Sequence, residues 1–534
     1  MNLSARPSRR VIAVTTATAT ALALVVLPTS AALAAPPAPG CDTRNNNTIA
    51  KIMECVTADG VTEHLEAFQA IADANGGNRA AGLPGYDASV DYVVETLQAA
   101  GWTVTLDDFP FTYVGPAVLQ QTAPVVATYE TGAYTGTGYG DISGNVLPVD
   151  INLTPPRDPV TSGCEAGDFA GLNFGGLNDI ALIQRGTCPF GVKAANAQAA
   201  GAEAVIIFNQ GNTPAREPLI VGTLVPSVVT IPVVGASFDQ GVALSAAGST
   251  ARVYVPAPEE RPQQNVIAEL PGRNDSNVVM AGAHLDSVPA GPGINDNGSG
   301  SAALLELAQN LSKLKPENTI RLAWWGAEEA GLLGSRAYVA EQSPEQLDDI
   351  ALYLNFDMIG SPNYIFMIYD GNESGFPAPV DVPEGSVQIE NLFERYFTSV
   401  DKPYDDAEFS GRSDYQAFIQ NGIPAGGLFT GAEVVKTPLQ ASIWGGTPGI
   451  AFDPCYHAVC DTLANVNTEA LEINSDAIAL SVLAYSYSTE LVNGVVGRSI
   501  PGGLVLPDAV GPQKSWAGPG GGLSQDHDHA LVAD

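Results

Sequence analysis

The sequence predicts a split α/β domain with a β-rich domain inserted into it. Residues 61–100 have apolar side chains at helical spacing, and strand-length apolar runs alternate with helical stretches again after Pro262. Between about 130 and 256, Gly, Thr and Pro punctuate short β runs and charged residues become rare. The change in texture at both ends of this middle block indicates an insertion.

Residues 1–35 are typical of a cleaved export signal. Three arginines precede an apolar stretch from Val11 to Leu27, and Ala32-Leu33-Ala34 fits a small-residue cleavage site. The apolar stretch is short and ends at the cleavage pattern, so we expect no permanent membrane anchor. The sequence therefore predicts a secreted, extracellular protein.

The first part of the split domain is expected over residues 36–130. Leu65, Phe68 and Ile71 mark one helix, and a second follows up to Gly101, which is a stop signal. Residues 102–111 alternate like a strand. The inserted domain, over residues 131–256, contains one βαβ-like unit, with strands at 180–185 and 204–208 around a helix at 191–200.

The second part of the split domain is expected over residues 257–493. It begins with a strand at 265–268, contains a helix at 299–314 and closes with a helix or helix pair at 469–491. Residues 494–534 are rich in Gly and Pro, which predicts a disordered tail.

The charge balance excludes some classes of partner. Over 534 residues the chain has 23 basic and 58 acidic side chains, a formal net charge of −35. Nucleic acids and anionic membranes are bound by basic patches, so we expect neither as a partner. An acidic, solvated surface suits a secreted protein.

All six cysteines lie after the predicted signal. They fall as three local pairs, Cys41/Cys55, Cys164/Cys188 and Cys455/Cys460. An exported chain with an even number of cysteines favours disulfides, and no Cys-x-x-Cys spacing supports the alternative of a zinc–thiolate site. The sequence alone does not choose among the possible pairings.

Three strand-like apolar runs each end in a side chain that can bind a metal. The run 278–283 is followed by His284, the run 319–326 by Glu328-Glu329, and the run 350–356 by Asp357. Ligands of open α/β sheets bind outside the carboxyl ends of the strands. We therefore expect these side chains to meet at one edge of the sheet.

Two further residues complete a candidate two-metal site. Asp296 lies in a glycine-rich loop over residues 292–300 and could bridge two ions. Taken alone, it would be interpreted as an Asx turn before a helix, but the presence of His284 favours the bridging role. His457 lies in the Cys455–Cys460 loop, which a disulfide would hold rigid. Zinc takes histidine nitrogens and carboxylate oxygens and keeps one position open in catalytic sites.

With these residues, the chain resembles the secreted di-zinc aminopeptidases of the bacterial leucyl aminopeptidase family, in peptidase clan MH. The resemblance covers most of residues 61–125 and 257–492, and its motifs are Ala283-His284-Leu285-Asp286-Ser287, residues 293–300, Trp325-Gly326-Ala327-Glu328-Glu329, Asn355-Phe356-Asp357-Met358, Gly411-Arg412-Ser413-Asp414, residues 426–431 and Cys455-Tyr456-His457. Residues 180–209, with Arg185-Gly186-Thr187-Cys188-Pro189-Phe190, resemble the protease-associated domain often inserted in this family. Tyr415 departs from relatives that have histidine there, and no role is carried over to it.

The resemblance implies an α/β zinc-exopeptidase fold, with a mixed central sheet and helices on both faces. It implies two Zn²⁺ per chain, one held by His284 and Asp357, the other by Glu329 and His457, with Asp296 between them. It also implies a cis peptide bond between Asp296 and Asn297. The other implied roles are Glu328 as general base, Tyr456 as donor to the oxyanion, Asp286 as hydrogen-bond partner of His284, and Arg412 and Phe429 as contacts of the bound peptide.

The function expected from the residues and the resemblance is hydrolysis of the N-terminal bond of peptides. A preference for bulky apolar N-terminal residues such as Leu comes from the resemblance alone. We expect the protein to be a monomer. Three alternatives remain: a carboxypeptidase or a glutaminyl cyclase of the same clan, or a catalytically silent binding module on the same fold.

Overall fold

The computed structural model describes residues 40–41, 43–226 and 229–516. The predicted export signal and the end of the predicted tail lie outside the described residues.

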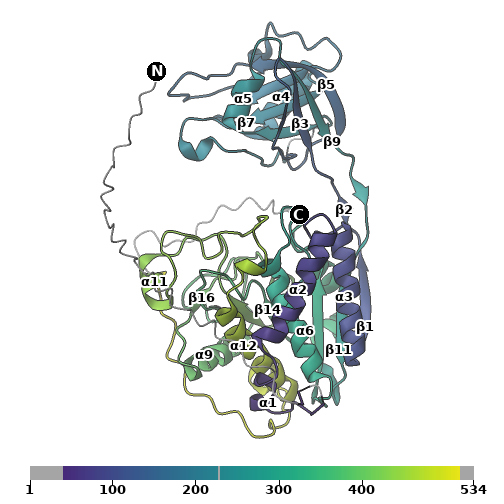
Figure 1. Cartoon of the computed structure of the whole chain (residues 1–534), viewed down its shortest axis with the longest axis vertical. Coiled ribbons are helices and arrows are strands. Elements are labelled where there is room, and N and C mark those ends of the chain that lie inside the picture. Colours follow the sequence, from purple (N-terminus) through teal and green to yellow (C-terminus); the bar gives the residue numbers. More distant parts are fainter. Residues whose placement is uncertain (1–39, 42, 227–228, 517–534) are drawn as a thin grey trace, which may run out of the picture. The chain divides into compact units, whose positions relative to one another are not determined.

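An eight-stranded mixed sheet forms the centre of the split domain (Figure 1). Four neighbouring central strands, β13, β12, β14 and β17, are parallel, while β1, β11 and β15 join with antiparallel pairings. In spatial order the strands are β1 (Thr103–Phe109), β11 (Gln263–Leu270), β13 (Asn318–Trp325), β12 (Asn274–His284), β14 (Ile350–Phe356), β17 (Ala425–Phe429), β15 (Met367–Tyr369) and β16 (Asp405–Ala407).

Helices cover both faces of this sheet, as the sequence predicts. Side chains of each strand alternate between two cores: on β14, Leu352 and Leu354 face one core and Tyr353 faces the other. The helices are α1 (Ile49–Met53), α2 (Ala58–Ala74), α3 (Pro84–Ala100), α6 (Ser299–Leu311), α7 (Leu333–Glu341), α8 (Pro344–Asp348), α9 (Ser386–Ser399), α10 (Tyr415–Gln420), α11 (Pro438–Trp444), α12 (Thr468–Tyr487) and α13 (Glu490–Asn493). Helices α2, α3, α6, α9 and α12 contribute to the first core, and α7 and α10 to the second.

Local signals set the helix boundaries near the N-terminus. Thr57 caps α2 by accepting a hydrogen bond from the backbone N–H of Gly60, and Gly101 ends α3 in the left-handed conformation with φ 88°. The predicted stop at Gly101 is thereby confirmed. Helices α2, α3 and α6 pack side by side (Figure 1), and their apolar stripes form much of the first core.

The inserted domain has its own sheet of seven strands and two cores. In spatial order the strands are β4 (Ala127–Tyr129), β3 (Val118–Ala123), β9 (Thr250–Val255), β5 (Gly140–Val149), β6 (Ile180–Gln184), β7 (Ala204–Phe208) and β8 (Val233–Ala236), with helices α4 (Phe190–Ala200) and α5 (Phe238–Leu244). The predicted βαβ unit corresponds to β6, α4 and β7. The inserted domain begins before the predicted boundary at residue 131, because strands β3 and β4 belong to this sheet and not to the split domain.

The chain leaves and re-enters the split domain through two short strands. Strands β2 (Thr112–Tyr113) and β10 (Glu259–Glu260) pair antiparallel with each other. The two crossings are therefore hydrogen-bonded to one another, which ties together the ends of the insertion.

Residues 494–516, which the sequence predicts to be disordered, make defined contacts with the split domain. The Asp405 carboxylate accepts hydrogen bonds from the backbone N–H groups of Lys514 and Ser515 at 3.0 and 2.8 Å, and Leu504 packs against the first core. The Trp516 ring lies 6.1 Å from the ring of Phe452. A Gly- and Pro-rich composition predicted disorder, but a buried carboxylate and apolar contacts give this segment fixed partners.

Three disulfides join the three local pairs, Cys41–Cys55, Cys164–Cys188 and Cys455–Cys460. This confirms disulfides over a zinc–thiolate site. Within the described part of the chain, every helix is too short or too polar to cross a lipid bilayer.

Candidate metal centre

Parallel strands bring the predicted ligands to one edge of the sheet. Strands β12 and β13 pair so that His284 lies opposite Trp325. Glu328 and Glu329 lie in the loop that directly follows Trp325. Asp357 directly follows β14 on the other side of β12. The three apolar runs thus end side by side, as the sequence predicts.

His284 lies against two carboxylates that can share a metal ion with it. Its Nε2 atom is 3.3 Å from Asp296 Oδ1 and 3.3 Å from Asp357 Oδ1. Glu328 Oε2 is farther away, at 3.9 Å. The His284 side chain is 1% exposed, so this group of possible ligands is anchored in the interior of the domain.

His457 forms a second group on the other side of Asp296. Its Nε2 atom is 3.0 Å from Glu329 Oε2 and 3.2 Å from Asp296 Oδ2. The two oxygens of Asp296 therefore face different histidines, Oδ1 toward His284 and Oδ2 toward His457. This is the arrangement that a bridging carboxylate requires.

The separations between these atoms fit zinc. Ligand atoms about 2.0–2.2 Å from a tetrahedral ion lie roughly 3.3 Å from each other, and the four histidine–carboxylate distances are 3.0 to 3.3 Å. Asp357 Oδ1 and Glu329 Oε1 are buried and have no hydrogen-bond partner among the described residues. Unpaired buried carboxylate oxygens are costly unless a cation or donor satisfies them, so the donor set fits a pair of divalent ions.

Electrostatics couple the two groups tightly. Burial lowers the pKa of His284, but the carboxylates of Glu328 and Asp357 outweigh it and raise that pKa well above its usual value. For His457, burial is likewise outweighed by Asp296 and Glu329, which raise its pKa to about 10. Burial raises the pKa of Glu329 to about 7 and that of Glu328 well above its usual value. Such concentrated, mutually perturbed carboxylates are typical of metal and catalytic sites.

Backbone strain marks the segments that hold the ligands. Ala327, just before Glu328, has φ 54°; Met358, just after Asp357, has φ 49°; and His457 itself has φ 54°. Non-glycine residues rarely adopt this left-handed region, and those that do cluster at functional sites. The surrounding contacts must therefore fix each of these three segments.

Arg79 holds the loop that carries Asp296. Its guanidinium is fully buried and donates hydrogen bonds to the backbone carbonyls of Pro292 at 2.9 Å, Gly293 at 2.6 Å and Leu285. Gly293 has φ 62°, and a Cβ there would lie 2.4 Å from the carbonyl oxygen of Asp296. The Asp296–Asn297 peptide bond is cis, as the resemblance implies.

Asp286 lies behind the site and contacts it differently from the expectation. His284 Nδ1 is 3.1 Å from the backbone carbonyl of Asp286, whereas the nearer carboxylate oxygen is 3.7 Å away. That carboxylate instead accepts the backbone N–H groups of Glu328 at 3.1 Å and Glu329 at 3.4 Å. Asp286 therefore positions both glutamates, and its backbone positions His284.

Tyr456, Arg412 and Glu433 form one rim of the site. The phenol of Tyr456 accepts a hydrogen bond from Arg412 Nη2 at 3.2 Å, and Arg412 Nη1 lies 3.0 Å from Glu433 Oε1. Burial and the nearby carboxylates of Asp296 and Glu329 raise the pKa of Tyr456, so its hydroxyl stays protonated. Its ring stacks on that of His457, with centroids 3.8 Å apart. Phe429, half-buried at the end of β17, precedes Thr430, whose N–H bonds Met358.

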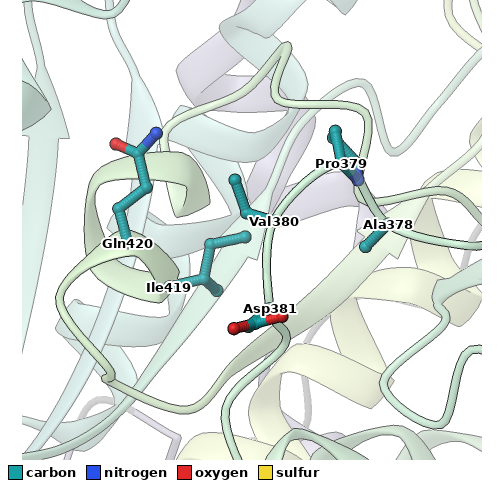
Figure 2. Close-up of a pocket in the computed structure, with 6 residues that line it drawn as sticks. All are labelled: Ala378, Pro379, Val380, Asp381, Ile419 and Gln420. Carbon is teal, nitrogen blue, oxygen red and sulfur yellow. The ribbon is translucent and has the colours of Figure 1, made fainter.

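A separate pocket lies elsewhere in the split domain. Ala378, Pro379, Val380, Asp381, Ile419 and Gln420 line it (Figure 2), with a volume of about 440 Å³. None of the candidate ligands lines this pocket, so it is not the place where the metal chemistry would occur.

Several contacts of the centre carried no signal in the sequence. They involve Arg79, Ser413, Glu433, Asp453, Asp461 and Asn465, each of which contacts a residue of the site or of its network. Arg79 and Asp461 are single charged residues outside any recognisable spacing. Ser413 lies in a motif quoted above, but nothing in its residue type indicated a contact with Asp357.

Comparison with known proteins agrees with the geometry. Peptidase family M28 matches residues 265–482, and the PA domain matches residues 149–244. An aminopeptidase of Pseudomonas aeruginosa (strain UCBPP-PA14) is 50% identical over 455 residues, covering 83% of this chain and 84% of its own. Leucine aminopeptidase 2 of Trichophyton tonsurans is 39% identical over 438 residues, covering 79% and 83%.

A solved structure shares the fold. The aminopeptidase from Aneurinibacillus sp. strain AM-1 superposes with a TM-score of 0.56 at 26% sequence identity, over 85% of this chain and 98% of that one. The matches cover 83% or more of each of these proteins' own length. The chain therefore belongs to peptidase family M28, as an aminopeptidase with an inserted PA domain.

Proposed function

We propose that this aminopeptidase is secreted, uses two zinc ions, and prefers a bulky apolar residue such as Leu at the N-terminus of its peptide substrates. The observation that carries the proposal is the position of Asp296, whose two carboxylate oxygens lie 3.3 and 3.2 Å from the histidines of two separate ligand groups. A single ion would not need a carboxylate turned toward both.

The ligand groups divide the five residues between two ions. His284 and Asp357 would hold one zinc, Glu329 and His457 the other, and Asp296 both. When bound, such a pair supplies Lewis-acid activation of water and of the scissile carbonyl. The protein contributes the remaining steps through side chains that lie around the pair.

Glu328 is the side chain we assign to proton transfer. It belongs to the first ligand group by distance, but its Oε2 atom is 3.9 Å from His284 Nε2, beyond the separations of the five ligands. Asp286 fixes its backbone, so that the carboxylate faces the site beside Glu329. Glu328 would take a proton from the attacking water and return it to the leaving amine.

Tyr456 is placed to stabilise the charge that develops on the carbonyl oxygen. Its hydroxyl accepts from Arg412, so its own proton remains available for donation into the site. Preorganised donors of this kind stabilise the oxyanion of acyl transfer. Arg412, oriented by Glu433, would contact the peptide near the same atom.

The N-terminal specificity rests on charge and on the relatives. The carboxylates of Glu328 and Asp357 can hold a free α-amine close to the scissile bond, and Phe429 offers an apolar contact for the side chain. A relative carries the name leucine aminopeptidase 2, which supports the apolar preference. We expect the enzyme to act as a monomer.

Secretion is supported by the sequence of residues 1–35 and by the cysteines. All three pairs form disulfides, which persist in oxidising compartments outside the cytosol. A cleaved signal followed by a disulfide-bonded enzyme is the arrangement we propose.

The test is metal analysis alongside an assay with leucine p-nitroanilide. We expect about two zinc ions per chain, loss of activity on chelation and its return when zinc is restored. His457→Ala should retain a single ion, whereas His64→Ala, which removes a buried histidine outside the site, should retain both. A metal-free preparation with full activity would overturn the proposal.

A further inference from the structure

A chain of buried hydrogen bonds reaches from the core of the split domain to Asp357. Trp325 Nε1 donates to Tyr353 Oη at 2.8 Å, and Tyr353 Oη donates to Asn355 Oδ1 at 3.1 Å. Asn355 Nδ2 donates to Ser413 Oγ at 2.8 Å, and Ser413 Oγ donates to Asp357 Oδ2 at 2.6 Å. These hydrogen bonds thus join strands β13 and β14, the residue after β14 and the loop before α10.

The direction of every bond in this chain is fixed by its ends. The indole N–H of Trp325 can only donate, so the Tyr353 hydroxyl accepts there and gives its own proton to Asn355. Asn355 then presents its carbonyl to Tyr353 and its NH₂ to Ser413. An ionised Asp357 can only accept, so the Ser413 proton points to it.

Gly282 makes the first link possible. Strand β12 runs between β13 and β14, so the bond from Trp325 to Tyr353 must pass across it. A Cβ at Gly282 would lie 2.5 Å from both Trp325 Nε1 and Tyr353 Oη. Any side chain at this position would therefore push the two groups apart.

Packing leaves the members of the chain little freedom. Trp325, Tyr353, Asn355 and Ser413 are at most 5% exposed. The Tyr353 ring stacks on Phe418 with centroids 3.8 Å apart and planes 3° from parallel. The phenol of Tyr369 also interacts with the side chains of Asn355 and Ser413.

The two carboxylate oxygens of Asp357 therefore have different surroundings. Oδ2 accepts the Ser413 proton, whereas Oδ1 has no hydrogen-bond partner among the described residues and lies 3.3 Å from His284 Nε2. We propose that Tyr353 and Asn355 are positioning residues, which act through Ser413 to restrict Asp357 to a single metal-binding oxygen. This inference rests on the proposed function, in which Asp357 binds zinc.

The restriction matters because catalytic zinc needs an open position. A carboxylate free to rotate can bind an ion through both oxygens and occupy the place that water or substrate requires. Partners of a ligand are known to tune metal sites, and their loss typically weakens metal affinity or activity about 10–100-fold. The hydrogen-bond chain would act on one of the two ions only.

The experiment compares Tyr353→Phe with Tyr338→Phe. Both remove a buried phenol hydroxyl from a ring that packs near Trp325, but the Tyr338 hydroxyl accepts from Arg321 and lies outside the chain. Zinc is withdrawn from each protein by a graded chelator, and the visible spectrum of the Co²⁺-substituted protein, whose band intensity reports coordination number, is recorded.

We expect Tyr353→Phe to release one of its two ions at a chelator concentration roughly 10–100-fold lower than the wild type requires. The second ion should be held as in the wild type, and the Co²⁺ bands should show a raised coordination number. Tyr338→Phe should match the wild type in both measurements. Equal retention of both ions in Tyr353→Phe, or equal weakening of both, would overturn the inference.

Gly282→Ala provides an independent break of the same link. Its methyl group would push Trp325 and Tyr353 apart without replacing any residue that forms these hydrogen bonds, so the binding of the same single ion should be weakened. If Gly282→Ala keeps wild-type retention of both ions, the link has no such role. A wild-type protein that binds fewer than two ions would instead contradict the proposed function, which keeps the two failures distinct.

Discussion

The Asp461 carboxylate accepts a hydrogen bond from the backbone N–H of Asp296 at 3.0 Å. Its other oxygen accepts the N–H of Asn295 at 2.9 Å, and Asn465 Nδ2 joins Asp461 to Asp453, which also accepts from Asn295 Nδ2 at 2.7 Å. Asp461 thus connects the loop of the bridging carboxylate to the segment that carries Tyr456 and His457, and the two ligand groups are parts of one hydrogen-bonded unit.

Replacing Asp461 with Asn should loosen both ions. The amide offers only one acceptor, so one of the two N–H groups at Asn295 and Asp296 would lose its partner. We expect zinc affinity to fall by roughly 10–100-fold, as for other partners of metal ligands, in a competition titration with a chelator. Asp370→Asn is the matched control, because Asp370 is also buried and accepts backbone N–H groups, from Ser374 and Gly375.

Replacing Glu328 with Ala should separate metal binding from catalysis. Because the five ligands remain, we expect about two zinc ions per chain by metal analysis. Turnover should fall at least about 10²–10⁴-fold, since general acid–base help is of that size and Glu328 would serve both proton transfers. Near-native turnover in this variant would show that another group takes the proton.

We expect the free energy of unfolding to depend on pH through His64, a buried histidine outside the metal centre. Burial lowers the pKa of His64 from 6.5 to about 4, so between these values the unfolded chain binds a proton that the folded chain does not. Stability contributed by neutral His64 is therefore present above pH 6.5 and lost as the pH falls toward 4.

The measurement is urea unfolding at a series of pH values between 4 and 7. The free energy of unfolding should fall on acidification less steeply in His64→Gln than in the wild type. Glu306, whose pKa burial raises to about 7, titrates in both proteins and contributes with the opposite sign. Its Oε2 atom lies 3.8 Å from His64 Nε2, so the difference between the two proteins reports His64 together with its effect on Glu306. Identical slopes would show that His64 does not titrate as stated.

The sequence predicted the strands and ligands of the centre because both leave local signals. His284 and Asp357 follow continuous apolar runs, and parallel strands necessarily align the residues at their carboxyl ends. Arg79, Asn355 and Asp461 leave no such signal, because each acts by contacting a segment far away along the chain. Their roles depend on which loops meet, which only the folded structure defines.

Composition misled in two places for a similar reason. The boundary of the inserted domain was set by texture, but β3 joins that sheet by pairing with β9, a partner more than a hundred residues later. Residues 494–516 have the composition of a disordered segment, but Asp405 and Tyr404 provide acceptors for their backbone N–H groups. In both places, hydrogen bonds between segments far apart along the chain determine the structure.

Blocking the substrate's N-terminus should separate an aminopeptidase from a carboxypeptidase. The carboxylates of Glu328 and Asp357 can pair with a free α-amine, whereas the cationic side chain on the described rim, Arg412, is already paired with Glu433. Acetylation of a Leu-initiated peptide should therefore abolish cleavage, because a site built to bind a charged group is left unpaired by an analogue that lacks it. Amidation of the C-terminus should change the rate little. Mass spectrometry of the products checks both, and stepwise release of C-terminal residues from the acetylated peptide would contradict the assigned direction of attack.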